Sequence, residues 1–567
     1  MKITLGRYLW ERIREVGTRS IMGVPGDFNL QLLDYIFEVE GLKWVGNQNE
    51  LNAAYAADGY ARVKGAPGCF VTTHGVGELS AMNGVAGSNA EHVKVIHVVG
   101  QTLRMMQKNH MMIHHNMGER PDHQVHNKSA LHVRVDAAEL WDTEKAPAEI
   151  DRVIRECILQ SHPVYIFIPL DMVWEEVPAN LLNTKIDLTP PVDEEAEKNA
   201  VDSIKKALGE AKTPALFVDG VTRQHGALEA ARELADVIKI PTFSSAWGKS
   251  IIDESEPYWV GMYNGKVNRP GVKEVMEQSD IVLVLGNFPS DLNTGSFTRG
   301  FDQKSTIYIN EYDVEIKGRK LSGTHIKSLI ERLATAMAGT ALSRRTCAAI
   351  PPWPPLAEAD STTLTQDWMW CRFASFLRPY DVILADIGTA PFGVLQNTVP
   401  AHTHVIAQVY WGSIGYAVPA ALGSELALDE LHHETGRPRG RTVLLTGDGS
   451  LALTMQEIAT MIAKDGVKPL IFVINNHGYA VERLIHGEEA PYNDIPPNKY
   501  AHLLPLYNHP DSAGAFRRVE TKAEFDKVLQ LPALQGDSDN VQMVELMLEK
   551  MDMPWMIKEM ARLRPGA

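Results

Sequence analysis

Residues 442–450 read TVLLTGDGS, and residues 470–478 read LIFVINNHG. In each segment, glycines and oxygen-bearing side chains follow at once after a run of apolar residues. Continuous apolar runs of this length are typical of strands buried on both faces of a parallel sheet, so we expect two such strands. Ligands bind outside the carboxyl ends of strands in parallel sheets. The two polar ends therefore form a candidate anion and metal site.

The same pattern recurs along the whole chain. Segments rich in helix-forming residues separate the apolar runs, for example at residues 51–63, 227–238 and 453–463. Alternating strands and helices indicate an α/β protein. We therefore predict three doubly wound α/β domains with mostly parallel sheets. The further apolar runs are residues 69–73, 93–99, 164–168, 215–218, 281–285, 306–309 and 382–385.

Two segments have the composition of linkers. Residues 186–197 (IDLTPPVDEEAE) combine paired prolines with acidic residues, and four prolines cluster within residues 341–365. A polar stretch at residues 429–441 is predicted to be a surface loop. The linkers divide the chain into three blocks of ordinary domain size. The predicted domains are residues 1–185, 186–345 and 346–567.

The composition excludes several classes of protein. The 567 residues are 44% hydrophobic and 22% charged, which is typical of a folded globular chain. The formal net charge of −16 gives no general attraction to nucleic acids or anionic membranes. The four cysteines form no C-x-x-C pair, and no apolar stretch is long enough for a membrane helix. We expect a cytoplasmic protein that binds neither nucleic acid nor membrane.

The two polar strand ends carry ligands suited to a hard cation. Asp448 follows the first strand, and Asn476 lies 28 positions later, directly after the second. A carboxylate and an amide oxygen suit Mg²⁺, which prefers oxygen ligands and shares its shell with phosphates. Gly478 could add a backbone carbonyl oxygen. Taken singly, each motif is equally well explained as a tight turn.

Together, the two motifs resemble the diphosphate and magnesium motif of thiamine diphosphate enzymes. Residues 49–62 resemble the helix N-E-x-x-A-A-x-x-A-x-G-Y-A-R of the same family. Five further segments resemble the pyruvate decarboxylase branch, the non-oxidative 2-oxo acid decarboxylases. The segments that carry this similarity are residues 23–30, 75–80, 114–115, 411–415 and 475–487.

The resemblance implies a fold, a reaction and an assembly. Pyrimidine-binding, middle and diphosphate-binding domains would follow one another along the chain. With thiamine diphosphate and Mg²⁺, the protein would convert a 2-oxo acid to an aldehyde and carbon dioxide through an ylid and an enamine of the cofactor. The active site would lie between two subunits of a homodimer or homotetramer. A carboligase that forms acyloins on the same cofactor, and a catalytically silent homologue, are the alternatives.

The resemblance also assigns roles to individual residues. Glu50 would hydrogen-bond the aminopyrimidine ring of the cofactor, although a lone Glu at a helix start is ordinarily explained by the helix dipole. Proton transfer would fall to Asp27, His114, His115 and Glu482, with pKa values tuned by burial. The implied metal ligands are Asp448, Asn476 and Gly478, and the other implied cofactor contacts are Thr389, Gly412, Ile414, Gly449 and Ser450.

Several positions depart from the pattern of pyruvate decarboxylases. Leu292 and Val481 stand where the family has Phe and Ile, and Pro391 stands where it has Ala. The first two changes remove volume from the expected substrate pocket, so we predict a substrate larger than pyruvate, branched or aromatic. Asn116 replaces the Thr that follows the His-His pair, close to the expected catalytic pocket.

Overall fold

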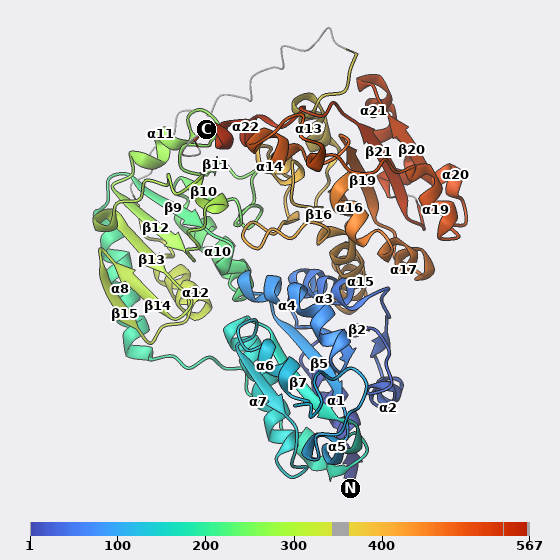
Figure 1. Ribbon diagram of the computed structural model, residues 1–567. Coiled ribbons are helices and arrows are strands. Elements are labelled where there is room, and N and C mark those ends of the chain that lie inside the picture. Colours follow the sequence, from blue (N-terminus) through green and yellow to red (C-terminus); the bar gives the residue numbers. More distant parts are fainter. Residues whose placement is uncertain (1, 343–361, 537, 564–567) are drawn as a thin grey trace.

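The computed structural model describes residues 2–342, 362–536 and 538–563, and it contains three large sheets, one in each third of the chain (Figure 1). Helices cover both faces of each sheet. The prediction of three α/β domains with mostly parallel sheets is confirmed. The predicted boundary at 345/346 lies outside the described residues, so the domain limits remain a prediction.

The N-terminal sheet has six parallel strands in the order β3-β2-β4-β5-β7-β6. One face is covered by α1 (Leu5–Glu15) and α7 (Ala146–Gln160), and the other by α3 (Glu50–Lys64) and α4 (Val76–Ala90). The strands are β2 (Ser20–Gly23), β3 (Lys43–Trp44), β4 (Gly68–Thr73), β5 (Val95–Gln101), β6 (Asp136–Glu139) and β7 (Val164–Pro169), and a separate pair joins β1 (Lys2–Thr4) to β8 (Glu176–Pro178).

The middle sheet has seven strands in the order β11-β10-β9-β12-β13-β14-β15. The first five are parallel, whereas β14 and β15 pair antiparallel. Helices α8 (Glu194–Glu210), α10 (Leu228–Ile238) and α12 (Ile326–Met337) cover one face, and α11 (Val272–Glu277) lies on the other. The strands are β9 (Pro214–Val218), β10 (Thr242–Ser244), β11 (Trp259–Met262), β12 (Ile281–Leu285), β13 (Thr306–Ile309), β14 (Asp313–Ile316) and β15 (Arg319–Ser322).

The C-terminal sheet has six parallel strands in the order β17-β16-β18-β19-β21-β20. Helices α13 (Gln366–Phe376) and α21 (Lys522–Leu529) pack on one face, and α15 (Ala417–Thr435) and α17 (Glu457–Ala463) pack on the other. The strands are β16 (Val382–Ala385), β17 (His404–Ile406), β18 (Thr442–Gly447), β19 (Leu470–Asn475), β20 (Phe516–Val519) and β21 (Gln542–Met547).

Helices α3 and α15 join the N-terminal and C-terminal domains in one shared core. Small residues let the two backbones approach closely, since a Cβ atom on Gly59 would lie 2.3 Å from the carbonyl oxygen of Ala420, and one on Gly423 would lie 1.9 Å from that of Ala56. Buried polar contacts reinforce the junction. Glu430 accepts hydrogen bonds from the hydroxyls of Ser20 (2.7 Å) and Tyr60 (2.5 Å).

Three predicted boundaries are wrong. The predicted helix 453–463 is two helices, α16 (Asp448–Thr454) and α17, with a break at residues 455–456. The acidic end of the predicted linker 186–197 is the first turn of α8, because Asp193 caps that helix and acidic residues are favourable at a helix N-terminus. Residues 429–435 of the predicted loop are the last turns of α15, so that loop is only residues 436–441.

Within the described ranges, no helix is both long and apolar enough to cross a membrane.

Candidate active site

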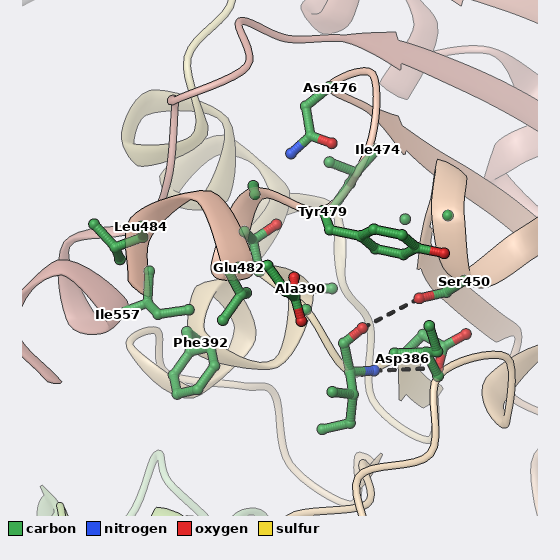
Figure 2. A pocket seen from close by; sticks show the side chains of 18 of the residues that line it. Asp386, Ala390, Phe392, Ser450, Ile474, Asn476, Tyr479, Glu482, Leu484 and Ile557 are labelled. Carbon is green, nitrogen blue, oxygen red and sulfur yellow. Dashed lines mark hydrogen bonds between the residues drawn. The ribbon is translucent and has the colours of Figure 1, made fainter. Parts of the chain in front are cut away.

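A pocket of about 190 Å³ lies beyond the carboxyl ends of β16, β18 and β19 (Figure 2). Segments 442–450 and 470–478, which carry the two polar strand ends, both contribute to it. The predicted site residues that line the pocket are Leu292, Thr389, Ile414, Asp448, Gly449, Ser450, Asn476, Gly478, Val481 and Glu482. The lining does not include Asp27, Glu50, His114, His115, Pro391 or Gly412.

Asp448 is the buried carboxylate of the pocket. It is 2% exposed and opens α16 directly after β18. The backbone N–H of Gly449 donates to Oδ1 (2.8 Å), and that of Gly478 donates to Oδ2 (3.0 Å). Burial raises the pKa of Asp448 to about 6, and the two hydrogen bonds oppose this rise. The carboxylate thus ties the ends of β18 and β19 together.

The turn after β19 places Asn476 and Gly478 beside Asp448. Arg483 stabilises this turn, since its guanidinium donates to the backbone carbonyls of Asn476 (3.1 Å) and His477 (2.6 Å). Gly478 has a φ of +130°, and a Cβ atom there would lie 2.2 Å from the carbonyl oxygen of Asn493. No other residue fits this position without strain.

The pocket has a polar end and an apolar end. Asp386 and Ser450 lie at one side, and Leu484 and Ile557 at the other (Figure 2). Asp386 accepts a hydrogen bond from the Thr446 hydroxyl (3.1 Å), and burial raises its pKa to about 7. Glu482 lies on α18 (Ala480–Ile485), where it is exposed on the pocket lining.

Pro391 does not line the pocket, although its neighbours Ala390 and Phe392 do. It occupies the first turn of α14 (Ala390–Leu395), where the fixed φ of proline suits a helix start. Its buried position indicates a structural contribution to this wall.

A second cluster of predicted residues lies in the N-terminal domain. His114 Nε2 donates a hydrogen bond to Asp27 Oδ2 (2.6 Å), and the ring of His115 lies 4.6 Å from that of His114. The rings of Phe28 and His114 stack with their centroids 5.1 Å apart. In the single chain, the Asp27 and His114 side chains are 51% and 58% exposed, so the burial expected for them is not found.

Asn116 supports the loop that carries both histidines. Its side-chain oxygen accepts a hydrogen bond from Nε2 of the buried His74 (3.0 Å), and its amide donates to the carbonyl of Ile113 (3.1 Å). Asn116 therefore joins this loop to the buried side chain of His74.

Glu50 is the first residue of α3 and is half-buried. Its Oε1 approaches the start of α4, where a Cβ atom on Gly77 would lie only 3.3 Å away. Gly412 has a φ of +66° and follows Trp411, whose backbone N–H donates to the buried Glu91 (3.2 Å). Neither Glu50 nor Gly412 lines the pocket, although Ile414, two positions after Gly412, does.

The chain is similar to known proteins along most of its length. Models of the thiamine pyrophosphate enzymes match residues 3–125 (N-terminal TPP binding domain), 201–335 (central domain) and 386–538 (C-terminal TPP binding domain). The chain belongs to the thiamine pyrophosphate enzymes. The resemblance inferred from the sequence motifs is thus confirmed.

Individual relatives place this thiamine pyrophosphate enzyme in the pyruvate decarboxylase branch. It is 42% identical over 565 residues to pyruvate decarboxylase isozyme 1 of Saccharomyces cerevisiae, with 99% of this chain and 98% of the yeast protein covered. The pyruvate decarboxylases of Kluyveromyces lactis (42%) and Candida albicans (39%) are similar over the same shares of the two chains.

Sequence reasoning missed several pocket residues of this thiamine pyrophosphate enzyme. Asp386 follows an apolar strand in the same way as Asp448, so the same pattern could have identified it. By contrast, α22 (Trp555–Arg562) contributes Ile557 and Met560. Its apolar spacing predicts an amphipathic helix but not the surface on which that helix packs.

Proposed function

We propose that the protein catalyses the non-oxidative decarboxylation of a 2-oxo acid to an aldehyde and carbon dioxide, with thiamine diphosphate and Mg²⁺ as cofactors. The observation that carries this proposal is the set of oxygen ligands at Asp448, Asn476 and Gly478, at the ends of two adjacent strands in a member of this family. The absence of a membrane-spanning helix in the described residues and the family relationship fit a cytoplasmic enzyme.

The pocket fits the cofactor and its metal ion. A carboxylate, an amide oxygen and a backbone carbonyl are the donors that Mg²⁺ prefers. Burial raises the pKa of Asp448 although the Arg483 guanidinium opposes the rise, and a divalent ion would further favour its charged form. A Cβ atom on Gly388 would meet no atom within 4 Å, and one on Gly447 would meet only Ser450 Oγ at 3.9 Å. Both glycines line open space that a diphosphate could fill.

The bound cofactor would supply the nucleophilic carbon and the electron sink for cleavage of the bond to the carboxylate. Asp448, Asn476 and Gly478 would hold Mg²⁺, and Ile414 would support the rings of the cofactor. Glu50 would hold a proton at the pyrimidine ring. Asp27, His114, His115 and Glu482 would carry protons to and from the substrate.

We propose that the active site is completed by a second copy of the chain. Glu50, Asp27, His114 and His115 do not line the pocket, and Asp27 and His114 are exposed while His115 is half-buried. Large apolar side chains are also exposed, such as Val76 (51%), Trp411 (40%) and Ile485 (48%). A homodimer or homotetramer would cover them and give the proton-transfer groups the burial that one chain lacks.

We propose a substrate larger than pyruvate, branched or aromatic. Leu292 and Val481 line the pocket together with Leu484, Ile557 and Met560. Restoring the bulk typical of the family with Leu292→Phe and Val481→Ile should lower kcat/KM for branched and aromatic acids relative to pyruvate by about tenfold or more. A wild-type enzyme that prefers pyruvate over 4-methyl-2-oxopentanoate, phenylpyruvate and indolepyruvate would contradict this part of the proposal.

The deciding experiment measures carbon dioxide and organic product from these four acids in the presence of thiamine diphosphate and Mg²⁺. Glu50→Gln should abolish turnover while the protein stays folded. The matched control is Glu40→Gln, an exposed glutamate of the same domain. Acyloin as the main product would identify a carboligase instead, and the absence of turnover despite cofactor binding would refute the proposed activity.

A further inference from the structure

Three potential metal ligands meet where the N-terminal domain contacts the middle domain. His92 lies between α4 and β5, His225 caps the short helix α9 (Val221–Gln224), and Glu311 follows β13. One ligand atom from each lies within 4.8 Å of the others. His92 Nδ1 and Glu311 Oε1 are 3.9 Å apart. This triad, His92–His225–Glu311, lies outside the pocket lining, and the proposed function gives it no role.

Three imidazole nitrogens of the triad are buried without a hydrogen-bond partner among the described residues. His225 is 6% exposed, and neither of its ring nitrogens has a hydrogen-bond partner among the described residues. His92 Nδ1 is also buried without a partner. Buried polar atoms of native proteins are almost always paired, and leaving one unpaired is costly. His92 and His225 come from different domains, have unpaired ring nitrogens and lie close to the same carboxylate. This arrangement indicates a bound ligand that would interact with both imidazoles and with Glu311.

The surroundings of the triad favour the ligand form of both imidazoles. Burial lowers the pKa of His92 to about 3, and it lowers the pKa of His225 well below its usual value. Neutral imidazole is the form that binds metal ions. The ring centroids of Trp247 and Phe288 lie 6.2 and 5.7 Å from that of His92, in edge-to-face geometry.

Other charged and titratable groups surround the triad. The rings of His162 and His92 lie 4.4 Å apart, and burial lowers the pKa of His162 to about 4, so it adds no charge near neutrality. Burial also lowers the pKa of His325. Lys94, Lys320 and Lys327 are cations of this region, and the Lys94 ammonium donates to the backbone carbonyl of Gln224 (2.6 Å). Glu311 is a carboxylate of this region, together with Asp313 and Asp219.

We propose that His92, His225 and Glu311 form a binding site for a divalent transition-metal ion, with Zn²⁺ as the best match. Two imidazoles and one carboxylate are a ligand set of zinc, whereas Mg²⁺ and Ca²⁺ prefer oxygen ligands alone. Bonds of about 2.0–2.2 Å in a tetrahedral shell bring ligand atoms to within roughly 3.5 Å of each other, so the His92–Glu311 pair must close only slightly.

The metal ion would have access to the site and would bridge two domains. The side chains of His92 and Glu311 are 18% and 28% exposed, which leaves room for entry and for a water molecule as fourth ligand. Because His92 belongs to the N-terminal domain and the other two ligands belong to the middle domain, bound metal would link the domains and stabilise their contact.

The test uses the full-length protein without an affinity tag, stripped with EDTA and kept in excess Mg²⁺. Co²⁺ is titrated as a spectroscopic probe for the zinc site, and Zn²⁺ is then added to displace it. The variants are His225→Gln and Glu311→Gln, the latter nearly isosteric and partly exposed. Two variants serve as controls. His433→Gln removes an exposed histidine beside Asp429, and His114→Gln disrupts the other group of potential ligands, Asp27, His114 and His115.

The wild type should bind one Co²⁺ per chain with the visible absorption of a tetrahedral site, and Zn²⁺ should displace it and raise Tm. Both triad variants should bind on the order of a hundredfold more weakly, whereas both controls should bind like the wild type. Equal affinity in Glu311→Gln and the wild type, or loss of the signal in His114→Gln, would overturn the assignment. If His225→Gln fails to fold, Glu311→Gln decides alone. These readouts need neither substrate nor thiamine diphosphate, so they are independent of the proposed activity.

Discussion

The contact between α3 and α15 predicts that Gly423→Ala destabilises the protein. The new Cβ atom would lie 1.9 Å from the carbonyl oxygen of Ala56, 2.7 Å from the amide nitrogen of Tyr60 and 2.8 Å from the carbonyl carbon of Ala56. All three are backbone atoms, so no side chain can rotate away. The helices must separate by more than about 1 Å to bring the contact above 3.0 Å, the distance below which real Cβ contacts are essentially never found.

The size of the effect follows from two opposing contributions. Alanine is a better helix former than glycine by about 0.5–1 kcal/mol, which favours the variant. Overpacking of a tight core costs about 1–3 kcal/mol and occasionally more, and two rigid backbones put this site at the upper end. We expect a net loss of about 2 kcal/mol in the free energy of unfolding. Gly209 in α8 is the matched control, because it is helical and exposed, and a Cβ atom there would meet nothing within 4 Å.

Thermal unfolding followed by circular dichroism compares the two variants at one scan rate. Gly423→Ala should lower Tm by several degrees, since 1 kcal/mol corresponds to roughly 2–4 °C for domains of this size. Gly209→Ala should leave Tm unchanged or raise it slightly. If Gly423→Ala melts at or above the wild-type temperature, the close approach of α3 and α15 is not rigid and the reasoning fails.

Three further predictions concern buried acidic groups. Burial raises the pKa of Glu78 from 4.5 to about 7. The contribution of protonated Glu78 to the free energy of unfolding, about 3 kcal/mol, is complete below pH 4.5 and is lost as the pH rises through 7. Glu78→Gln should therefore flatten the dependence of Tm on pH between about 5 and 8. Glu457 accepts hydrogen bonds from the side-chain amides of Asn47 (2.9 Å) and Asn52 (2.8 Å); Glu457→Leu should cost about 1–3 kcal/mol for each donor left unpaired, and Glu457→Gln less, as measured by urea unfolding. Asp448→Asn should weaken Mg²⁺-dependent binding of thiamine diphosphate at least about tenfold in a fluorescence titration, and unchanged affinity would remove Asp448 from the metal site.

Local sequence patterns predict the centres of the sheets well and their edges poorly. Strands such as β4, β18 and β19 are buried on both faces, so their apolar runs are visible without tertiary information. The antiparallel edge strand β15 has three exposed residues out of four and carries no such run. The acidic residues 194–197 have the composition of a linker but form a helix, because capping by Asp193 and packing of Val201 and Ile204 outweigh composition.

The residues of the candidate site likewise include some that local sequence patterns predict and others that depend on tertiary or quaternary structure. Asp448, Asn476 and Gly478 were predicted from strand ends, and the structure brings them to one pocket. The roles of Glu50, Asp27 and the two histidines rest on motif similarity, and in the proposed assembly a second chain would bring them to the site. Ile557 and Met560 reach the pocket from α22, near the end of the described chain. Such long-range packing has no local signature.

The α3–α15 junction also constrains how the chain acquires its structure during synthesis. The hydrogen bond between Ser20 and Glu430 joins residues 410 positions apart, and the alanine-rich face of α3 is covered only when α15 is present. At ~5–20 residues per second, translation of the intervening chain takes roughly 20–80 s. During that interval the apolar face of α3 in the N-terminal domain is exposed to solvent. A nascent chain would most need a chaperone at this stage.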